Sequence, residues 1–232
     1  QKKEFIRLGV LGDWNNPYLT MDFKFEANIV RALGKMLEKG VLERGKKPVH
    51  WCVACSSALA EAEVEYQDKV SLSIDFGFPL YDSDLLPIFN QKIEGPIFIA
   101  SWTTTPWTLP GNTALCVNAE LEYSLISIVI NSQNINLILA KKLIEKTLER
   151  IGISKFKEID SCLGVKLEGL KARHPYLDRV SEIILADHVT VDAGTGVVHT
   201  APGHGIEDFQ AAKTYDLPVL NPIKDNGTFK EE

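Results

Sequence analysis

The chain contains the stretch Trp102-Thr103-Thr104-Thr105-Pro106-Trp107-Thr108-Leu109-Pro110, in which a run of threonines meets two prolines. Side chains of an extended segment alternate between two faces, so consecutive threonines offer hydroxyls on both. Pro106 keeps Thr105 extended, because the residue before a proline is pushed out of the α region. We expect a rigid corner with several hydroxyls beside Trp107, which suits a small substrate with one polar and one apolar end.

A second stretch, GTGVVHTAPGHGIED at residues 194–208, is rich in glycine. Its four glycines and its proline mark a backbone held in unusual conformations. Residues 197–198 are predicted to form a short buried strand, with His199 leaving its end. After a tight glycine loop, residues 206–215 are predicted to form a helix that starts with two acids.

Together these two stretches resemble the editing domain of bacterial-type isoleucyl-tRNA synthetases. The resemblance extends over almost the whole chain, because four more segments match the family: LGVLGDW at 8–14, PYLTM at 17–21, PVHWC at 48–52 and SALAEAEVEY at 57–66. The related valyl and leucyl enzymes carry an arginine and an acid where this chain has Thr105 and Trp107, which favours the isoleucyl member. Gly111 departs from the family, which has alanine there.

Size and composition are those of a globular protein that can bury a full core: 232 residues, 45% hydrophobic and 24% charged. Four cysteines in a chain of this length do not make a disulfide scaffold, so a reduced, cytoplasmic setting is expected. The sequence shows neither a membrane-spanning run nor a signal peptide. Because it opens on Gln1 and not on methionine, we expect a fragment of a longer enzyme.

Hydrophobic periodicity predicts an α+β fold, with a β-barrel-like body and a few packed helices. The resemblance implies that residues 1–47 are a helical segment beside the synthetase core and that residues 48–232 are the inserted editing domain. Helices are predicted at 22–39, capped by Asp22, and at 140–151. Strands are predicted at 62–66, 72–78, 97–102, 123–130, 135–139, 183–186 and 196–199, with a hairpin turn at 131–134.

The resemblance implies hydrolysis of valine that was wrongly attached to isoleucine tRNA, and so three tasks for the site. An anion must hold the substrate ammonium, polar groups must hold the ester and water, and an apolar wall must fit valine. Asp208 is the candidate anion; without the resemblance it would be an acid stabilised by a helix N-terminus. Thr104 and Thr105, with Thr103 and Thr108, are candidates for holding the ester, the terminal ribose and the attacking water.

The wall that excludes isoleucine is assigned to Trp107 and His199, although a lone histidine after buried valines is more often a core residue. His199 is also a candidate for orienting water, so the catalytic set becomes Thr104, Thr105, His199 and Asp208. His204 is a further substrate-binding candidate, with loop packing as its alternative. Asn112 matches a family position that affects selectivity, and its alternative is a turn residue.

No cofactor or metal is expected for this segment. Cys52 and Cys55 form one C-x-x-C, which is half of a structural zinc site, and His50 lies nearby in the sequence. The activation motifs His-Ile-Gly-His and Lys-Met-Ser-Lys-Ser are absent from the sequence, so ATP and magnesium are expected to act only in the full enzyme. Cys116 and Cys162 are predicted to be buried small residues.

The resemblance implies two partners: the remainder of the synthetase chain, and the 3′ terminal adenosine of isoleucine tRNA carrying valine. The net charge of −6 implies that most of the grip on RNA comes from elsewhere, or that only the terminal nucleotide enters. Two alternatives stay open at this point. One is a valyl-type editing domain that removes threonine, and the other is a tRNA-positioning module without hydrolysis.

Overall fold

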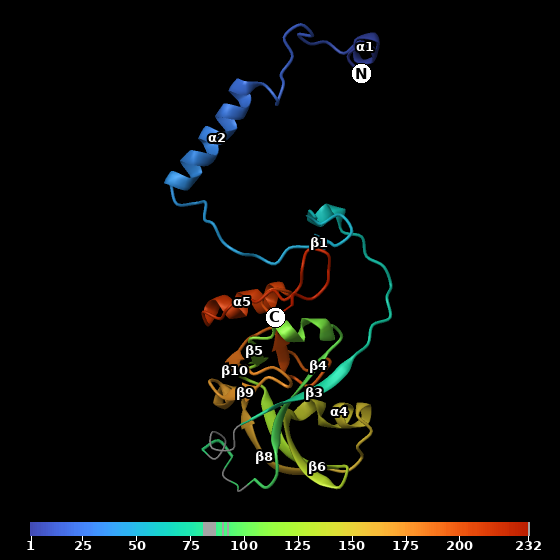
Figure 1. Cartoon of the computed structure of the whole chain (residues 1–232), viewed down its shortest axis with the longest axis vertical. Coiled ribbons are helices and arrows are strands. Elements are labelled where there is room, and N and C mark those ends of the chain that lie inside the picture. The colour runs from blue at the N-terminus through green and yellow to red at the C-terminus, as the bar shows by residue number, and fades with distance from the viewer. Residues whose placement is uncertain (81–86, 90, 92, 232) are drawn as a thin grey trace. The chain divides into compact units, whose positions relative to one another are not determined.

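The computed structural model divides into two compact units, Gln1–Lys46 and Lys47–Glu232 (Figure 1). It describes residues 1–231 apart from 81–86, 90 and 92. What each unit does in a longer protein stays a prediction. In the described part of the chain, no helix combines the length and the apolar character needed to cross a bilayer.

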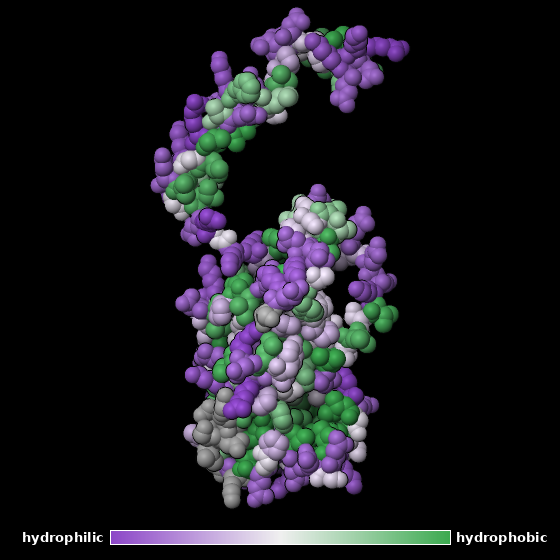
Figure 2. All heavy atoms as spheres, in the orientation of Figure 1, coloured by the Kyte–Doolittle hydropathy of each residue, from purple (hydrophilic) through white to green (hydrophobic). Residues whose placement is uncertain are grey.

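The first unit contains α1 (Lys2–Arg7) and α2 (Phe23–Glu38). The helix predicted at 22–39 is confirmed, and the Asp22 side chain accepts hydrogen bonds from the backbone N–H groups of Lys24 (2.9 Å) and Phe25 (3.4 Å). None of the residues of α2 is buried, and hydrophobic residues are exposed along this segment (Figure 2). Its stability within the described chain therefore rests on capping and helix propensity, since it has no packed core of its own.

A five-stranded sheet carries the larger part of the second unit, with strand order β3-β4-β7-β6-β8. Only the β4–β7 pair is parallel. Asn131 and Ser132 have φ of 50° and 65°, so the β6–β7 hairpin closes on two left-handed residues, as its twist requires. The strands are β3 (Ile74–Pro79), β4 (Ile97–Thr103), β6 (Glu122–Ile130), β7 (Gln133–Ala140) and β8 (Lys157–Leu163).

A four-stranded sheet with order β11-β5-β10-β9 completes the body. Strand β10 runs parallel to β5, while the other two pairs are antiparallel. Helix α5 (Ile206–Thr214) and the residues after it pack on this sheet through a small apolar cluster. The strands are β5 (Ala114–Val117), β9 (Lys171–Arg173), β10 (Val180–Leu185) and β11 (Val198–Thr200).

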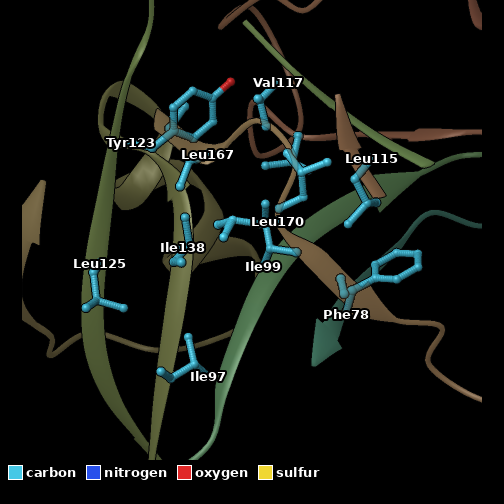
Figure 3. Packing of buried hydrophobic residues seen from close by; sticks show 14 of the residues in the cluster. Phe78, Ile97, Ile99, Leu115, Val117, Tyr123, Leu125, Ile138, Leu167 and Leu170 are labelled. Atoms are coloured by element: carbon cyan, nitrogen blue, oxygen red, sulfur yellow. The ribbon is translucent and has the colours of Figure 1, made fainter. Parts of the chain in front are cut away.

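The main core lies between these two sheets. Figure 3 shows labelled side chains of both sheets in one interior, among them Ile99 and Ile138 from one sheet and Leu115 and Val117 from the other. Helix α4 (Ile144–Arg150) covers another face of the five-stranded sheet through a second apolar cluster. The expected α+β body with a few helices is confirmed, and the described strands form open sheets without closing into a barrel.

Short elements complete the second unit. A hairpin is formed by β1 (Trp51–Cys52) and β2 (Ser57–Ala58). The 3-10 helices are η1 (Glu61–Glu63), η2 (Pro106–Gly111), η3 (Lys141–Leu143) and η4 (Gly164–Leu167).

The strand predicted at 62–66 is wrong. The chain there forms η1, where the Glu63 carboxylate accepts the backbone N–H of Ala60 at 2.8 Å, and Tyr66 is 86% exposed. An alternating pattern becomes a strand only where a neighbouring strand is available for pairing.

The bounds of three other predicted elements differ from those in the structure. The hairpin turn is two residues long and not four, His199 lies inside β11 and not at its end, and the helix predicted at 140–151 begins as η3. Strands β1, β2, β5, β8 and β9 have no counterpart among the predicted strands. Strand β5 is buried at every residue, so it has no alternation to detect.

Gly196 joins the two sheets at the entrance to β11. Its φ is 75°, and a Cβ there would lie 2.3 Å from the Cβ of Ala140 at the end of β7. The buried Tyr123 hydroxyl donates to the Gly196 carbonyl at 2.7 Å, and the Ala140 N–H donates to Thr195 at 2.9 Å. Only glycine meets both demands, because it tolerates positive φ and has no side chain to collide.

Replacing Gly196 by alanine should destabilise the fold by about 1–3 kcal/mol more than replacing Gly152. Both glycines have positive φ, so both variants bear the left-handed backbone penalty of about 1–2 kcal/mol. A Cβ at Gly152 meets nothing within 4 Å, so the difference isolates the collision with Ala140. Urea unfolding of the two variants measures it, and equal losses would contradict the packing argument.

Candidate functional site

A cavity of about 320 Å³ lies where the end of β4, the chain before and within β11, and the start of α5 meet. Its lining combines hydroxyls, imidazoles and one carboxylate. It includes these predicted site residues: Thr103, Thr104, Thr105, Thr108, His199, His204 and Asp208. The structure thus brings two stretches about ninety residues apart into one site.

Strand pairing explains how the two stretches meet. Strand β11 pairs with β5, with His199 opposite Leu115, and β5 follows directly on the threonine stretch. The buried Ser101 hydroxyl of β4 donates to the Val197 carbonyl at 3.0 Å. The Thr113 N–H donates to the Thr200 carbonyl at 3.0 Å on the other side of His199. The position of β11 is therefore fixed by β4 on one side and by the chain that leads into β5 on the other.

The threonine corner is held by its own hydroxyls. The Thr103 hydroxyl accepts the Thr105 N–H at 3.1 Å and lies 3.3 Å from the Thr105 hydroxyl. The Thr105 backbone carbonyl accepts hydrogen bonds from both the N–H (3.0 Å) and the hydroxyl (2.8 Å) of Thr108, and these bonds start the turn of η2. Thr104 and Thr105 are exposed at the cavity, whereas Thr103 and Thr108 are buried. The exposed pair is the one free to meet a ligand.

His199 is almost fully buried, at 7% exposure, and both of its ring nitrogens have protein partners. Nε2 lies 2.8 Å from the Thr108 hydroxyl, and Nδ1 lies 2.8 Å from the Asn112 amide nitrogen. Burial lowers the pKa of His199 to about 4, with further lowering from His174 and His204. The Phe76 ring packs edge-on against the His199 ring, with ring centroids 6.3 Å apart. His199 is a neutral, fixed side chain at neutral pH.

Asp208 lies in the first turn of α5 and carries the cavity's carboxylate. Its Oδ2 accepts the Ala201 N–H at 2.8 Å, which directs the side chain toward the site. Burial raises the pKa of Asp208, partly offset by that hydrogen bond. Neighbouring Glu207 is exposed and does not line the cavity. A half-buried carboxylate beside a cavity favours a cationic ligand, which would compensate the charge that is partly removed from water.

Two predicted site residues are not in this cavity. Asn112 is fully buried behind His199, so it reaches the site only through that ring. Trp107 is 49% exposed and packs edge-on against His204, with ring centroids 5.3 Å apart. It lines a second hollow of about 550 Å³, which shares His204 with the first and also includes Trp51 and Lys224.

Sequence reasoning left out Trp102 and His188. Both line the cavity, and within the described residues Trp102 Nε1, His188 Nε2 and His204 Nε2 are buried without a hydrogen-bond partner. Unpaired buried nitrogens are costly unless a ligand or water pairs with them. Trp102 belongs to the threonine-rich stretch at 102–110, whereas the sequence around His188 indicates nothing beyond its place after a predicted strand.

Cys52 and Cys55 lie at the β1–β2 hairpin, where the Cys55 N–H donates to Cys52 Sγ at 3.4 Å. Among the residues the structure describes, no three His, Cys, Asp or Glu side chains are arranged to hold a metal ion. Two thiols alone do not complete the four ligands of a structural zinc site. Cys116 and Cys162 are buried, as predicted.

Comparison with protein families gives a match to the class I tRNA synthetases (I, L, M and V) over residues 1–211. The isoleucine–tRNA ligase of Chromobacterium violaceum is 53% identical over 231 residues, which are 99% of this chain and 24% of that protein. That of Alcanivorax borkumensis is 50% identical over 233 residues, which are 100% of this chain and 25% of that protein. The chain spans about a quarter of the length of these curated relatives.

Among solved structures, the editing domains of cytosolic leucyl-tRNA synthetases from two Plasmodium species share the fold. That of P. falciparum has a TM-score of 0.52 at 12% identity, covering 62% of this chain and 66% of that one. That of P. knowlesi has a TM-score of 0.52 at 15% identity, covering 62% of each chain.

The Asp208→Asn variant should be more stable than the parent at neutral pH. The raised pKa means that ionised Asp208 penalises the folded state; this penalty is full above the raised pKa and is lost as the pH falls from there toward the ordinary pKa of an aspartate. Asparagine keeps an oxygen for the Ala201 N–H. We expect a higher melting temperature for the variant at pH 7.5 and a smaller difference as the pH is lowered toward 4. Glu207→Gln is the exposed control and should change little; a parent more stable than Asp208→Asn at pH 7.5 would contradict the assignment.

Proposed function

The chain belongs to the class I tRNA synthetases (I, L, M and V), and we propose that residues 48–232 are the editing domain of an isoleucine–tRNA ligase. In this proposal the domain hydrolyses the ester of valine attached to isoleucine tRNA. Valyl-adenylate, which carries the same valyl group, is included as a second substrate. The hydrolysis needs no cofactor, and ATP and magnesium act only in amino-acid activation by the full enzyme.

A physical limit explains why such an activity is needed. Valine lacks one methylene of isoleucine, and a single hydrophobic pocket discriminates that difference by only about 1–3 kcal/mol, a magnitude known from this very class of enzyme. A second pocket that admits valine but is too small for isoleucine multiplies the selectivity. Excess bulk in a rigid pocket costs about 1–3 kcal/mol, so shape acts as the second test.

The observation that carries the proposal is the meeting of Asp208, the threonine hydroxyls and the fixed His199 in one cavity. Asp208 is the partner for the substrate ammonium, because its desolvation makes a carboxylate without a neighbouring cation costly. Thr104 and Thr105 hold the ester, the terminal ribose and the attacking water. His199 limits the space for the amino-acid side chain.

The volume of about 320 Å³ stands at the lower end of the range for small-molecule sites. It fits an aminoacylated terminal nucleoside better than a longer RNA segment. The net charge of −6 agrees with this, since phosphate neutralisation normally carries nucleic-acid affinity. The rest of the synthetase chain would supply most of the grip on the tRNA.

In the proposed step, water adds to the ester carbonyl carbon and the bond to the ribose oxygen breaks. Valine and a tRNA with a free terminal hydroxyl are released, and the proton of the water passes to the leaving ribose oxygen. A threonine nucleophile would need an adjacent base. The Thr108 hydroxyl is within 2.8 Å of His199 but is also within 2.8 Å of the Thr105 carbonyl, to which it donates. Direct attack by water is therefore preferred.

The chain at high concentration should deacylate valyl-tRNA(Ile), and Asp208→Ala should lower the rate at least about thirtyfold. Loss of a charged partner in a desolvated site costs on the order of 2–5 kcal/mol. Release of labelled valine from the tRNA gives the rate. Glu207→Ala is the matched control, because this neighbouring acid is exposed and lies outside the cavity.

The same assay separates the alternatives. Hydrolysis of threonyl-tRNA(Val) in place of valyl-tRNA(Ile) would support valyl-type editing. Binding of tRNA without hydrolysis of either would support a positioning module. A normal rate for Asp208→Ala together with a loss in Glu207→Ala would refute the assigned anion.

His199→Ala should let isoleucine enter the cavity. Removing the ring opens space for at least one more methylene, so the rate ratio of isoleucyl-tRNA(Ile) to valyl-tRNA(Ile) hydrolysis should rise about tenfold or more. Parallel deacylation of the two charged tRNAs measures this ratio. Loss of both activities would point instead to an acid–base role, and an unchanged ratio would return His199 to the core.

A further inference from the structure

We propose that Asn112 and Ser181 lock His199 as a neutral imidazole with its proton on Nε2, which makes His199 a fixed wall of the cavity and not a base. The first half of this proposal concerns the protein alone. The second half rests on the proposed editing function. Ser181 lies on β10, outside the cavity lining, so it is a positioning residue that acts through Asn112.

The orientation of the Asn112 side chain follows from its neighbours. Its Nδ2 lies 2.8 Å from the Ala114 carbonyl oxygen and 3.4 Å from that of Thr200. Carbonyl oxygens only accept hydrogen bonds, so the amide group that faces them must be the NH₂. Oδ1 then faces Ser181, whose hydroxyl donates to it at 2.5 Å. The reversed amide would set its oxygen against two carbonyl oxygens.

This orientation decides which nitrogen of His199 carries the proton. Asn112 Nδ2 lies 2.8 Å from His199 Nδ1, and the NH₂ group can only donate. Nδ1 must therefore accept, so it is unprotonated. A neutral imidazole with a bare Nδ1 has its hydrogen on Nε2.

A second set of contacts, on the other side of the ring, gives the same answer. The Thr108 hydroxyl lies 2.8 Å from the Thr105 carbonyl oxygen, which accepts its only proton. The same hydroxyl lies 2.8 Å from His199 Nε2, so it must accept there, and Nε2 must donate. Two independent hydrogen-bond chains thus require one tautomer.

The residues behind His199 are buried and anchored. Asn112 and Ser181 are fully buried, and the Arg179 guanidinium donates to the main-chain carbonyl of Asn112 at 2.7 Å and to that of Pro110 at 3.0 Å. The side chain and the backbone of Asn112 are therefore both anchored. Burial lowers the pKa of His199 to about 4, which agrees with a neutral ring.

The consequence for the proposed reaction is specific. A general base must offer a free lone pair within reach of the water proton. On His199 the Nδ1 lone pair is occupied by Asn112, and Nε2 already carries a hydrogen. Both ring nitrogens are therefore paired with protein atoms, and only the ring carbon atoms have no polar partner. It contributes a rigid, weakly polar surface, which is what exclusion by shape requires.

The tautomer can be measured directly on the chain with ¹⁵N-labelled histidine. Long-range ¹H–¹⁵N correlation spectra distinguish protonated from bare ring nitrogens, and the signals of His199 are those lost in His199→Phe. We expect a bare Nδ1, a protonated Nε2 and no titration between pH 8 and pH 5. A protonated Nδ1, or a ring that titrates near pH 6, would overturn the lock whatever the enzyme activity.

The positioning role is tested with Ser181→Ala. Loss of one hydrogen bond to the Asn112 oxygen should raise the ratio of isoleucyl- to valyl-tRNA(Ile) hydrolysis about fivefold and shift the ¹⁵N signals of His199. Ser124→Ala is the matched control, because Ser124 is also fully buried and donates to Glu158 at 2.7 Å, yet lies on β6 and outside the cavity lining. Equal effects of the two variants would reduce Ser181 to a general structural role. The expected tautomer without any hydrolysis would leave the lock standing and refute the editing function alone.

Discussion

The close approach of Gly196 to Ala140 determines where the chain enters β11, and the geometry of the site follows from it. The left-handed glycine allows the chain to pass against the end of β7, and the Tyr123 hydroxyl holds its carbonyl at 2.7 Å. Strand β11 then adds to β5 in the one register that sets His199 opposite Leu115. A different entry point would move His199 away from Thr108 and Asn112.

Desolvated polar groups in the site lower the free energy of unfolding of the ligand-free protein. Asp208 is a carboxylate whose pKa is raised by burial, and Trp102 Nε1 and His188 Nε2 are buried without partners among the described residues. Each of these arrangements costs free energy in the empty protein. A ligand that brings a cation and hydrogen-bond partners would recover that cost, which links these groups to the proposed use of the cavity on an aminoacyl ester.

Around His199 the opposite principle applies, because every polar atom is paired. Ser181, Asn112, His199, Thr108 and the Thr105 carbonyl form one continuous chain of donors and acceptors. A fully paired network is rigid, since any rotation of one member breaks the bonds of its neighbours. The proposed selection by size depends on such rigidity, because a wall that can move aside makes room for one more methylene.

The sequence by itself determined the chemistry of the site and much of the fold. Periodicity and caps placed α2, α4, α5 and most strands of the five-stranded sheet, because these signals are local. The two quoted stretches supplied the threonines, His199 and Asp208 that line the cavity. The pattern failed at 62–66, where alternation had no partner strand, and at β5, where complete burial removes alternation.

Only the tertiary structure decided where the predicted site residues lie relative to the cavity. Asn112 and Trp107 were assigned to the substrate by their place in the motif, yet Asn112 lies behind His199 and Trp107 faces the neighbouring hollow. Ser181 carries no local signal, because its role comes from a hydrogen bond to Asn112, which is far along the chain. His188 carries none either, because only the folded chain places it in the cavity lining. The sequence shows which groups are available, whereas the pairing of β5 with β10 and β11 in one sheet fixes which atoms meet.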